Sequence, residues 1–109
     1  MGGEVFQMSK YKSVRTSVDN IIFDSRKEAG RYGELKLMLK CGLITDLELQ
    51  KRYEVRVNGV LICKYFADFA YKDADGRDVV EDTKGVRTAV YAIKAKLMLA
   101  CHGIRIVET

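Results

Sequence analysis

The dipeptide Asn58-Gly59 constrains the fold of this chain more than any other feature of its sequence. It separates two runs of strand-forming residues, Arg52–Val57 and Val60–Tyr71, and Asn-Gly between such runs is the strongest short-range signal for a β-hairpin. A second turn is expected at Asp73–Gly76, before a third strand over Asp78–Lys84. The centre of the chain therefore predicts a meander of three antiparallel strands.

A shorter hairpin is predicted near the N-terminus, after a poorly ordered lead-in over residues 1–11. Ser13–Val18 and Asn20–Phe23 are β-prone runs that meet at a turn-forming Asp19-Asn20. The chain has 109 residues, a length that fits one domain, which we expect to span residues 12–109.

A first helix is predicted between this hairpin and the meander. Asp24 and Ser25 both offer N-caps for a helix that runs to about Cys41, where Gly42 closes it. The next segment, Leu43–Leu49, is expected to be a loop or a short strand.

A second helix and a last strand are predicted after the meander. Thr88 can cap a helix over Ala89–Cys101 that stops near Gly103, and Ile104–Val107 then forms a short strand. A strand that arrives after a helix suggests a parallel crossover onto the sheet. The element order is β-β-α-β-β-β-α-β, which predicts an α/β or α+β fold with one mixed β-sheet flanked by helices.

Composition and cysteine spacing exclude several classes of protein. No apolar run approaches the roughly 20 residues that span a bilayer, and residues 1–9 lack the pattern of a signal peptide. Cys41, Cys63 and Cys101 form no C-x-x-C pair, so neither a disulfide framework nor a zinc knuckle is expected. We expect these cysteines to be small buried residues in a reducing compartment. The only histidine, His102, sits beside a helix terminator, which argues against a Ser-His-Asp mechanism.

A single carboxylate interrupts the second strand of the meander. Asp68 lies within the apolar run Tyr65–Tyr71. Because burying an unpaired carboxylate is costly, such a residue usually has a partner or a metal ion. The structural alternatives are an edge strand with Asp68 in water, or a salt bridge to an arginine.

The third strand carries a second carboxylate and a lysine. Side chains alternate along a strand, so Asp82 and Lys84 share one face while Glu81 and Thr83 share the other. The short turn makes the strands of Asp68 and Asp82 antiparallel neighbours, so both carboxylates can reach one cation. An oxygen-only site of this kind suits Mg²⁺ or Mn²⁺. The structural alternative is a cross-strand ladder of salt bridges.

A third acid lies in the first turn of the first helix. Glu28, Tyr32, Leu35 and Leu39 follow the spacing of one helical stripe, which predicts that Glu28 is on the buried face. Glu34 is expected in solvent. Ser25-x-x-Glu28 also matches a capping box, so Glu28 is either a capping residue or a ligand of a metal or water.

At these residues the chain resembles the PD-(D/E)XK nuclease superfamily, whose pattern is a helix glutamate, a strand aspartate, a hairpin and then (D/E)-x-K. The ending Asp82-Thr83-Lys84-Gly85 is similar to the E-T-K-G of some phage Holliday-junction resolvases. The chain also resembles a family of small phage- and prophage-encoded proteins of unknown function. Similar segments there are Phe23–Ala29, Leu47–Gln50, Ala67–Phe69 and Val80–Gly85, so the resemblance covers roughly residues 10–106. The superfamily's proline before the strand aspartate is Ala67 here.

The resemblance implies a restriction-endonuclease-like core and a metal-dependent DNA endonuclease that acts in the cytoplasm of a bacterial host. Asp68 and Asp82 would hold Mg²⁺ or Mn²⁺, with the carbonyl of Thr83 as a further ligand and Glu28 binding a second metal or its water. Lys84 would orient the attacking water and stabilise charge on phosphorus.

Gln50 and several cations complete the expected site. Gln50 is either a group that positions water or phosphate, or a polar residue beside a turn. Lys94 follows the motif strand on the second helix and is expected to face the site. The candidates for binding DNA phosphates are Lys10, Lys12, Arg15, Lys51, Arg52, Arg87, Lys94 and Lys96.

The expected substrate is branched DNA, because no base-reading motif is present in the sequence. Cutting two strands usually needs two active sites, so a homodimer is expected. Three alternatives remain open: a nicking or mismatch nuclease, a DNA-binding module of the same fold without activity, and a structural protein whose acids form salt bridges.

Overall fold

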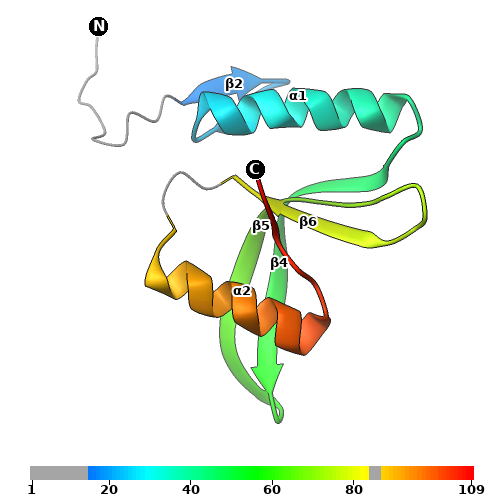
Figure 1. The fold of residues 1–109 in the computed structure, drawn as a ribbon. Coiled ribbons are helices and arrows are strands. Elements are labelled where there is room, and N and C mark those ends of the chain that lie inside the picture. The colour runs from blue at the N-terminus through cyan, green and yellow to red at the C-terminus, as the bar shows by residue number, and fades with distance from the viewer. Residues whose placement is uncertain (1–14, 84–86) are drawn as a thin grey trace, which may run out of the picture. The chain divides into compact units, whose positions relative to one another are not determined.

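The computed structural model describes residues 15–83 and 87–109 of the chain. In this part the elements follow the order β2, β3, α1, β4, β5, β6, α2, β7 (Figure 1). The chain divides into two compact units, residues 1–34 and 35–109, which we describe separately. Two helices and a mixed sheet confirm the expected mixed α and β class.

The N-terminal unit contains a two-stranded hairpin and the start of a helix. β2 (Thr16–Val18) pairs antiparallel with β3 (Ile21–Phe23) across Asp19 and Asn20, which both have positive φ, 54° and 64°. Two such residues form the turn type that matches strand twist, as the sequence predicts. The Tyr32 hydroxyl donates a 2.8 Å hydrogen bond to Asp19, and its ring lies 5.0 Å from that of Phe23.

The helix α1 (Arg26–Lys40) begins and ends where its capping residues predict. The Ser25 hydroxyl accepts a 3.1 Å hydrogen bond from the Glu28 amide, which is the capping half of a capping box. At the other end Gly42 has φ +78°, and the Leu43 amide donates to the Met38 carbonyl at 2.9 Å.

The predicted stripe of α1 is confirmed by its burial. Glu28, Tyr32 and Leu35 are buried and Leu39 is half-buried. Glu34 is exposed, as expected, and forms a 2.9 Å ion pair with Arg31.

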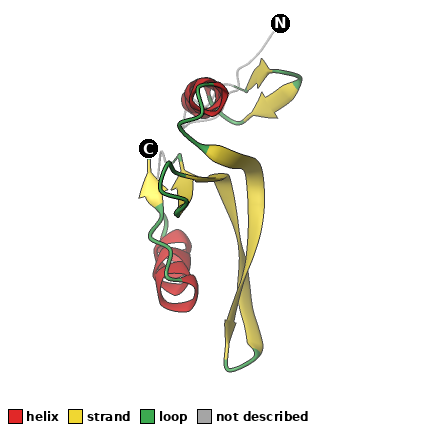
Figure 2. Cartoon of the chain, turned by 90° about the vertical axis from the view of Figure 1, so that its right-hand side faces the viewer, coloured by secondary structure: helices red, strands yellow, loops and turns green. Residues whose placement is uncertain are grey.

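The C-terminal unit is built on a four-stranded mixed sheet in the order β4-β5-β6-β7. β4 (Thr45–Val57), β5 (Val60–Lys72) and β6 (Asp78–Asp82) are antiparallel neighbours, and β7 (Val107–Glu108) runs parallel to β6. The predicted meander and parallel crossover are thereby confirmed, but the last strand is Val107–Glu108 and not the predicted Ile104–Val107. Figure 2 shows β4 and β5 as one long twisted hairpin, with α2 along one of its faces.

β4 is longer than the sequence predicts. The expected strand began at Arg52, and Leu43–Leu49 was expected to form a separate loop or short strand. β4 is one continuous strand from Thr45, and two register shifts interrupt its pairing with β5. Asp46 and Gln50 have positive φ, 57° and 51°, yet half-buried and exposed residues alternate regularly from Leu47 to Tyr53.

The core of this unit lies between the β4–β5 hairpin and α2 (Ala89–His102). Its buried members are Val55, Tyr65, Ala67, Ala70, Val80, Tyr91 and Met98. Ala67 and Ala70 both belong to it although they are three residues apart, and both faces of β5 are buried from Phe69 to Tyr71.

Thr88 caps α2, as predicted, because its hydroxyl accepts a 3.1 Å hydrogen bond from the Tyr91 amide. Gly103 ends the helix with φ +68°. We expect Thr88→Ala to lower the free energy of unfolding by about 1 kcal/mol, because one amide of the first turn loses its partner. Thr88→Ser keeps the hydroxyl and should remain near wild type in urea denaturation. Equal losses in both variants would contradict a capping role.

The cysteines are not the buried residues that the sequence suggests. Cys41 and Cys101 are exposed and Cys63 is half-buried, and all three are free thiols. Cys41 lies just past the end of α1 and Cys101 in the last turn of α2, where neither faces the core. No helix in residues 15–83 and 87–109 is long and apolar enough to cross a membrane.

Candidate active site

Asp68 is held by donors from the strands on both sides of β5. Its Oδ1 accepts a 3.1 Å hydrogen bond from Gln50 Nε2 on β4, and its Oδ2 accepts a 2.8 Å bond from the Thr83 amide after β6. The side chain is half-buried. The carboxylate therefore bridges three neighbouring strands and lies at the peptide that follows Asp82.

Asp82 lies one residue beyond the last pair that joins β5 and β6. That pair is Phe69↔Glu81, and one further step in an antiparallel ladder would place Asp68 across from Asp82. Asp82 is the last residue of β6 and is 1% exposed. Its carbonyl accepts a 3.0 Å hydrogen bond from the Thr109 amide, which ties the end of β6 to the C-terminal segment.

Tyr65 is a site residue that the sequence reasoning missed. Its hydroxyl donates a 2.6 Å hydrogen bond to Asp82 Oδ2 within the core. Burial, and then the bond to Asp82, raise the pKa of Tyr65 well above its ordinary value. The hydroxyl therefore stays protonated at neutral pH and remains a donor to the carboxylate. A tyrosine three residues before a strand aspartate was the available signal, but regular alternation places it on the wrong face.

Glu81 takes a different partner from Asp82. Its carboxylate accepts a hydrogen bond from the Tyr71 hydroxyl, and its side chain is 1% exposed. Tyr71 pairs with Val79, two residues before Glu81, so these side chains share a strand face. Successive carboxylates of β6 are therefore fixed by different tyrosines.

Gln50 is directed toward Asp68 by an unusual backbone conformation. Its φ of 51° lies in the left-handed region, which costs energy for residues other than glycine. The pairs Leu49↔Phe69 and Lys51↔Ala67 enclose it, so Gln50 lies opposite Asp68. Gln50 therefore contacts Asp68 from a backbone conformation that residues other than glycine rarely adopt.

Two further residues of the expected site, Glu28 and Lys84, stay predictions. Glu28 is buried but belongs to the N-terminal unit, whereas Asp68 and Asp82 belong to the other unit. Lys84 lies outside the described residues. Thr83 is described, and its hydroxyl lies 3.0 Å from that of Thr109.

The donor set suits a hard divalent cation with open coordination positions. Mg²⁺ is commonly bound through one or two carboxylates, with waters and phosphate oxygens as its other ligands. Asp68 and Asp82 provide two carboxylates on adjacent strands. In the described part of the chain, no group of three or more His, Cys, Asp or Glu side chains is placed to hold a metal ion. By donor type, Asp68 and Asp82 are the kind of ligands that a two-carboxylate Mg²⁺ or Mn²⁺ site would use.

The cations expected to bind DNA differ in whether they already interact with other residues of the protein. Lys51 lies 3.4 Å from Glu48 and 5.4 Å from the ring centroid of Tyr53, and Arg87 is ion-paired with Glu108. Lys94 is half-buried on the side of α2 that carries Tyr91 and Met98. The exposed cations of this set are Arg15, Arg52, Arg87 and Lys96, while Lys10 and Lys12 lie outside the described residues.

Glu108 also accepts a 3.1 Å hydrogen bond from the Tyr91 hydroxyl. Burial raises the pKa of Tyr91, and the bond to Glu108 raises it further. Arg87 lies over the Tyr91 ring at 5.3 Å, so this cation packs against α2 as well as pairing with β7.

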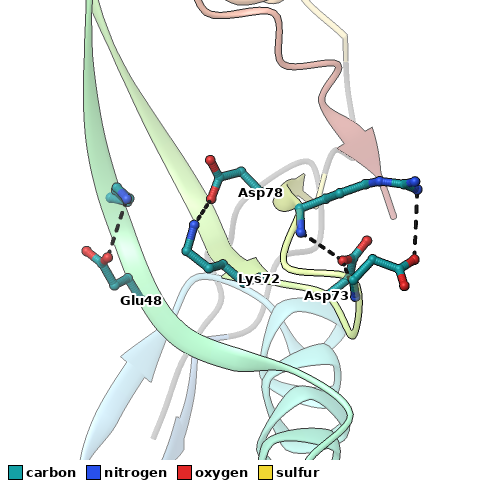
Figure 3. A network of polar contacts seen from close by, with 7 residues as sticks. Glu48, Lys72, Asp73 and Asp78 are labelled. Carbon is teal, nitrogen blue, oxygen red and sulfur yellow. Dashed lines mark hydrogen bonds and ion pairs between the residues drawn. The ribbon is translucent and has the colours of Figure 1, made fainter.

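A separate hollow of about 270 Å³ lies along β4 and β5 near the β5–β6 turn. Its walls include Glu48, Lys51, Lys72 and Asp78, but neither Asp68 nor Asp82. Figure 3 shows that charges here pair with each other, with Lys72 and Asp78 2.8 Å apart. The hydrogen bond between Lys72 and Asp78 lowers the pKa of Asp78 and raises the pKa of Lys72. The charged side chains that line this hollow pair with each other, and the hollow does not include the carboxylates of Asp68 and Asp82.

The Asp73 side chain orders the β5–β6 turn. It accepts 2.9 Å hydrogen bonds from the amides of Asp75 and Arg77, and Gly76 takes φ +79° (Figure 3). The turn predicted at residues 73–76 is confirmed, and it fixes the register that aligns β6 with β5.

His102 has a structural contact rather than a catalytic one. A ring nitrogen lies 2.7 Å from the Glu54 carbonyl, and the ring meets that of Tyr53 edge-on at 5.7 Å. These contacts join the end of α2 to β4.

Comparison with known protein families assigns the chain to one of them. The model of the family described as "Protein of unknown function (DUF1064)" matches residues 8–102, and the chain belongs to this family. The comparisons with curated proteins and with solved structures found no match.

Proposed function

We propose that this member of the DUF1064 family is a metal-dependent DNA endonuclease that hydrolyses phosphodiester bonds, selective for branched DNA. One observation carries the proposal: the Asp68 carboxylate lies within hydrogen-bond distance of the peptide after Asp82. Two carboxylates on adjacent antiparallel strands, followed by Lys84 two residues later, form the arrangement of the PD-(D/E)XK nucleases that the sequence resembles. The element order of the described residues is compatible with a restriction-endonuclease-like core in one domain over residues 12–109.

Asp68 and Asp82 would hold the cation. When bound, Mg²⁺ or Mn²⁺ supplies charge that polarises the scissile phosphate and lowers the pKa of coordinated water. The two carboxylates repel each other without a cation, and their protein donors offset part of this repulsion. Tyr65 fixes one oxygen of Asp82, and Gln50 with the Thr83 amide fixes Asp68. Such outer contacts orient ligands for binding.

The remaining residues would act on water and phosphate. Lys84 would orient the attacking water and stabilise the charge that develops on phosphorus. The Thr83 carbonyl would add a ligand, and Glu28 would bind a second cation or its water. Lys94, half-buried on α2, would contribute positive charge near the substrate.

Cleavage of both arms of a branched substrate needs two active sites, so we propose that the enzyme acts as a homodimer. Light scattering of the protein with a four-way junction should give a mass of two chains per junction. A mass of one chain per junction would contradict this stoichiometry.

Cleavage assays test the proposed function. The protein is incubated with a labelled four-way junction and a linear duplex of matching sequence, with Mg²⁺, with Mn²⁺ or with EDTA. We expect cleavage in both metals, none in EDTA, and a preference for the junction. Equal cleavage of both substrates would contradict selectivity for branches. Binding of the junction without cleavage in either metal would indicate an inactive DNA-binding module.

A further inference from the structure

The β4–β5 hairpin presents one face to α2 and the other to solvent (Figure 2). Val55, Tyr65 and Ala67 pack against α2 in the core. Because strand side chains alternate, the outer face carries the residues between them. On β5 these are Lys64 and Phe66, and on β4 they include Arg52, which pairs directly with Phe66.

Phe66 is an unusual residue for this outer face. It is 52% exposed, and Ile62 on the same strand is also 52% exposed. Arg52 and Lys64 are exposed, and neither has a carboxylate within 4 Å among the residues that the structure describes. Arg56 differs, since it is paired with Glu54 at 3.1 Å. The face therefore combines one open aromatic ring with two cations that form no ion pair within 4 Å with any described residue, and the carboxylate opposite Lys64, that of Glu54, is paired with Arg56.

This face is continuous with the carboxylate site along both strands. Phe66 precedes Asp68 by two residues, and Arg52 follows Gln50 by two. At about 3.4 Å per residue, the ring lies roughly 7 Å along the strand from Asp68, and Lys64 roughly 14 Å. A strand of nucleic acid that reaches the site along the hairpin would meet Phe66 just before the carboxylates.

The geometry points to a single-strand-binding track on the outer face of the β4–β5 hairpin, in which Phe66 stacks an unpaired base while Arg52 and Lys64 bind the flanking phosphates. This inference rests on the proposed function and names how that site recognises its DNA. Aromatic rings bind unpaired bases by stacking, and cations bind the backbone beside them. Bases in an intact duplex are already stacked on each other, so the track favours branch points and single-stranded ends.

Binding measured without cleavage tests this track. Fluorescence anisotropy in EDTA compares a labelled single strand, a four-way junction and a blunt duplex. We expect Phe66→Leu, which keeps an apolar side chain, to weaken single-strand binding roughly 5- to 150-fold and blunt-duplex binding much less. Phe66→Tyr should restore binding. Because Phe66 is exposed, thermal melting should be unchanged in both variants.

The cations have a matched control in Arg77, an exposed arginine on the β5–β6 turn of the same unit. Arg52→Gln should weaken single-strand binding and reduce the slope of log affinity against log salt by about 0.7. Arg77→Gln removes the same charge elsewhere and should leave that slope near wild type. An equal effect of the two variants would overturn the track.

Other outcomes separate this inference from the proposed nuclease activity. Wild-type affinity of Phe66→Leu for single strands overturns the track, even if the enzyme cleaves DNA. A change in mass of Phe66→Leu by light scattering, with DNA binding unchanged, also overturns it and indicates an interface between protein chains. Loss of binding in Phe66→Leu and Arg52→Gln, in a wild type that never cleaves, supports the track and refutes the nuclease.

Discussion

Asp82→Asn should reduce metal-dependent cleavage by roughly 10²- to 10³-fold or more, while the protein stays folded. The reason is electrostatic: a neutral amide holds a divalent cation poorly, so stabilisation of charge at the phosphate is lost. Asparagine has the shape of aspartate, and its carbonyl oxygen can still accept the hydrogen bond from Tyr65. Initial cleavage rates on a four-way junction, with circular dichroism to monitor folding, measure the effect.

Asp78→Asn is the matched control for this prediction. Asp78 lies on the same strand, has a side chain that is 61% exposed and pairs with Lys72 away from the carboxylate site. The control should cleave at the wild-type rate. Cleavage by Asp82→Asn at a rate comparable to that of Asp78→Asn would refute a catalytic role for Asp82.

Tyr65→Phe should lower the free energy of unfolding by about 1–3 kcal/mol, because a buried carboxylate loses a hydrogen-bond donor. The hydroxyl and Asp82 Oδ2 are 2.6 Å apart, and Asp82 is almost fully buried. Tyr53→Phe is the control, since the Tyr53 hydroxyl makes no hydrogen bond to the residues the structure describes and its loss should cost less. Urea denaturation at pH 7 compares the variants. Equal stability of wild type and Tyr65→Phe would show that Asp82 does not depend on this donor.

The effect of Tyr65 on stability depends on pH with a defined sign. Burial raises the pKa of Tyr65 in the folded protein above the ordinary tyrosine value of about 10. The Tyr65 hydroxyl therefore contributes fully to the free energy of unfolding below about pH 10. Its contribution declines at higher pH, where the tyrosine releases its proton in the unfolded chain but not in the folded protein. We expect the stability difference between wild type and Tyr65→Phe to narrow as pH rises above about 10. A difference that widens would contradict the raised pKa.

The Tyr65→Phe variant also tests whether Tyr65 positions Asp82 for metal binding. If it orients Asp82 for the cation, Tyr65→Phe should weaken Mn²⁺ binding by roughly 10- to 100-fold, the range for groups that orient metal ligands. Unchanged Mn²⁺ affinity together with lower stability would indicate a structural role alone.

Local signals in the sequence predicted much of the fold because they act over a few residues. Asn58-Gly59 forms its turn with φ of 52° and 81°, and Thr88 and Gly103 bound α2 as their residue types require. The early part of β4 was not recognised as a continuous strand. Apolar residues alternate there at Leu47, Leu49, Tyr53 and Val55, but Lys51 takes one of the half-buried positions and interrupts the pattern, while pairing with β5 maintains the strand.

The candidate site was predictable in part for the same reason. Alternation and one short turn suffice to align Asp68 with Asp82, because antiparallel register follows from the turn. The contact of Tyr65 with Asp82 depends instead on how β5 and β6 pack in the core, which regular alternation does not predict. The burial of the cysteines was also misjudged, because composition gives a residue's tendency and not the direction of its side chain.

If Asp68 and Asp82 together form one divalent-cation site, titration of Mn²⁺ followed by electron paramagnetic resonance should detect it. Wild type and the control Asp78→Asn should each show a saturable site, and both Asp68→Asn and Asp82→Asn should lose it. Saturable Mn²⁺ binding that survives in both of these variants, or its absence from the wild type, would contradict the account.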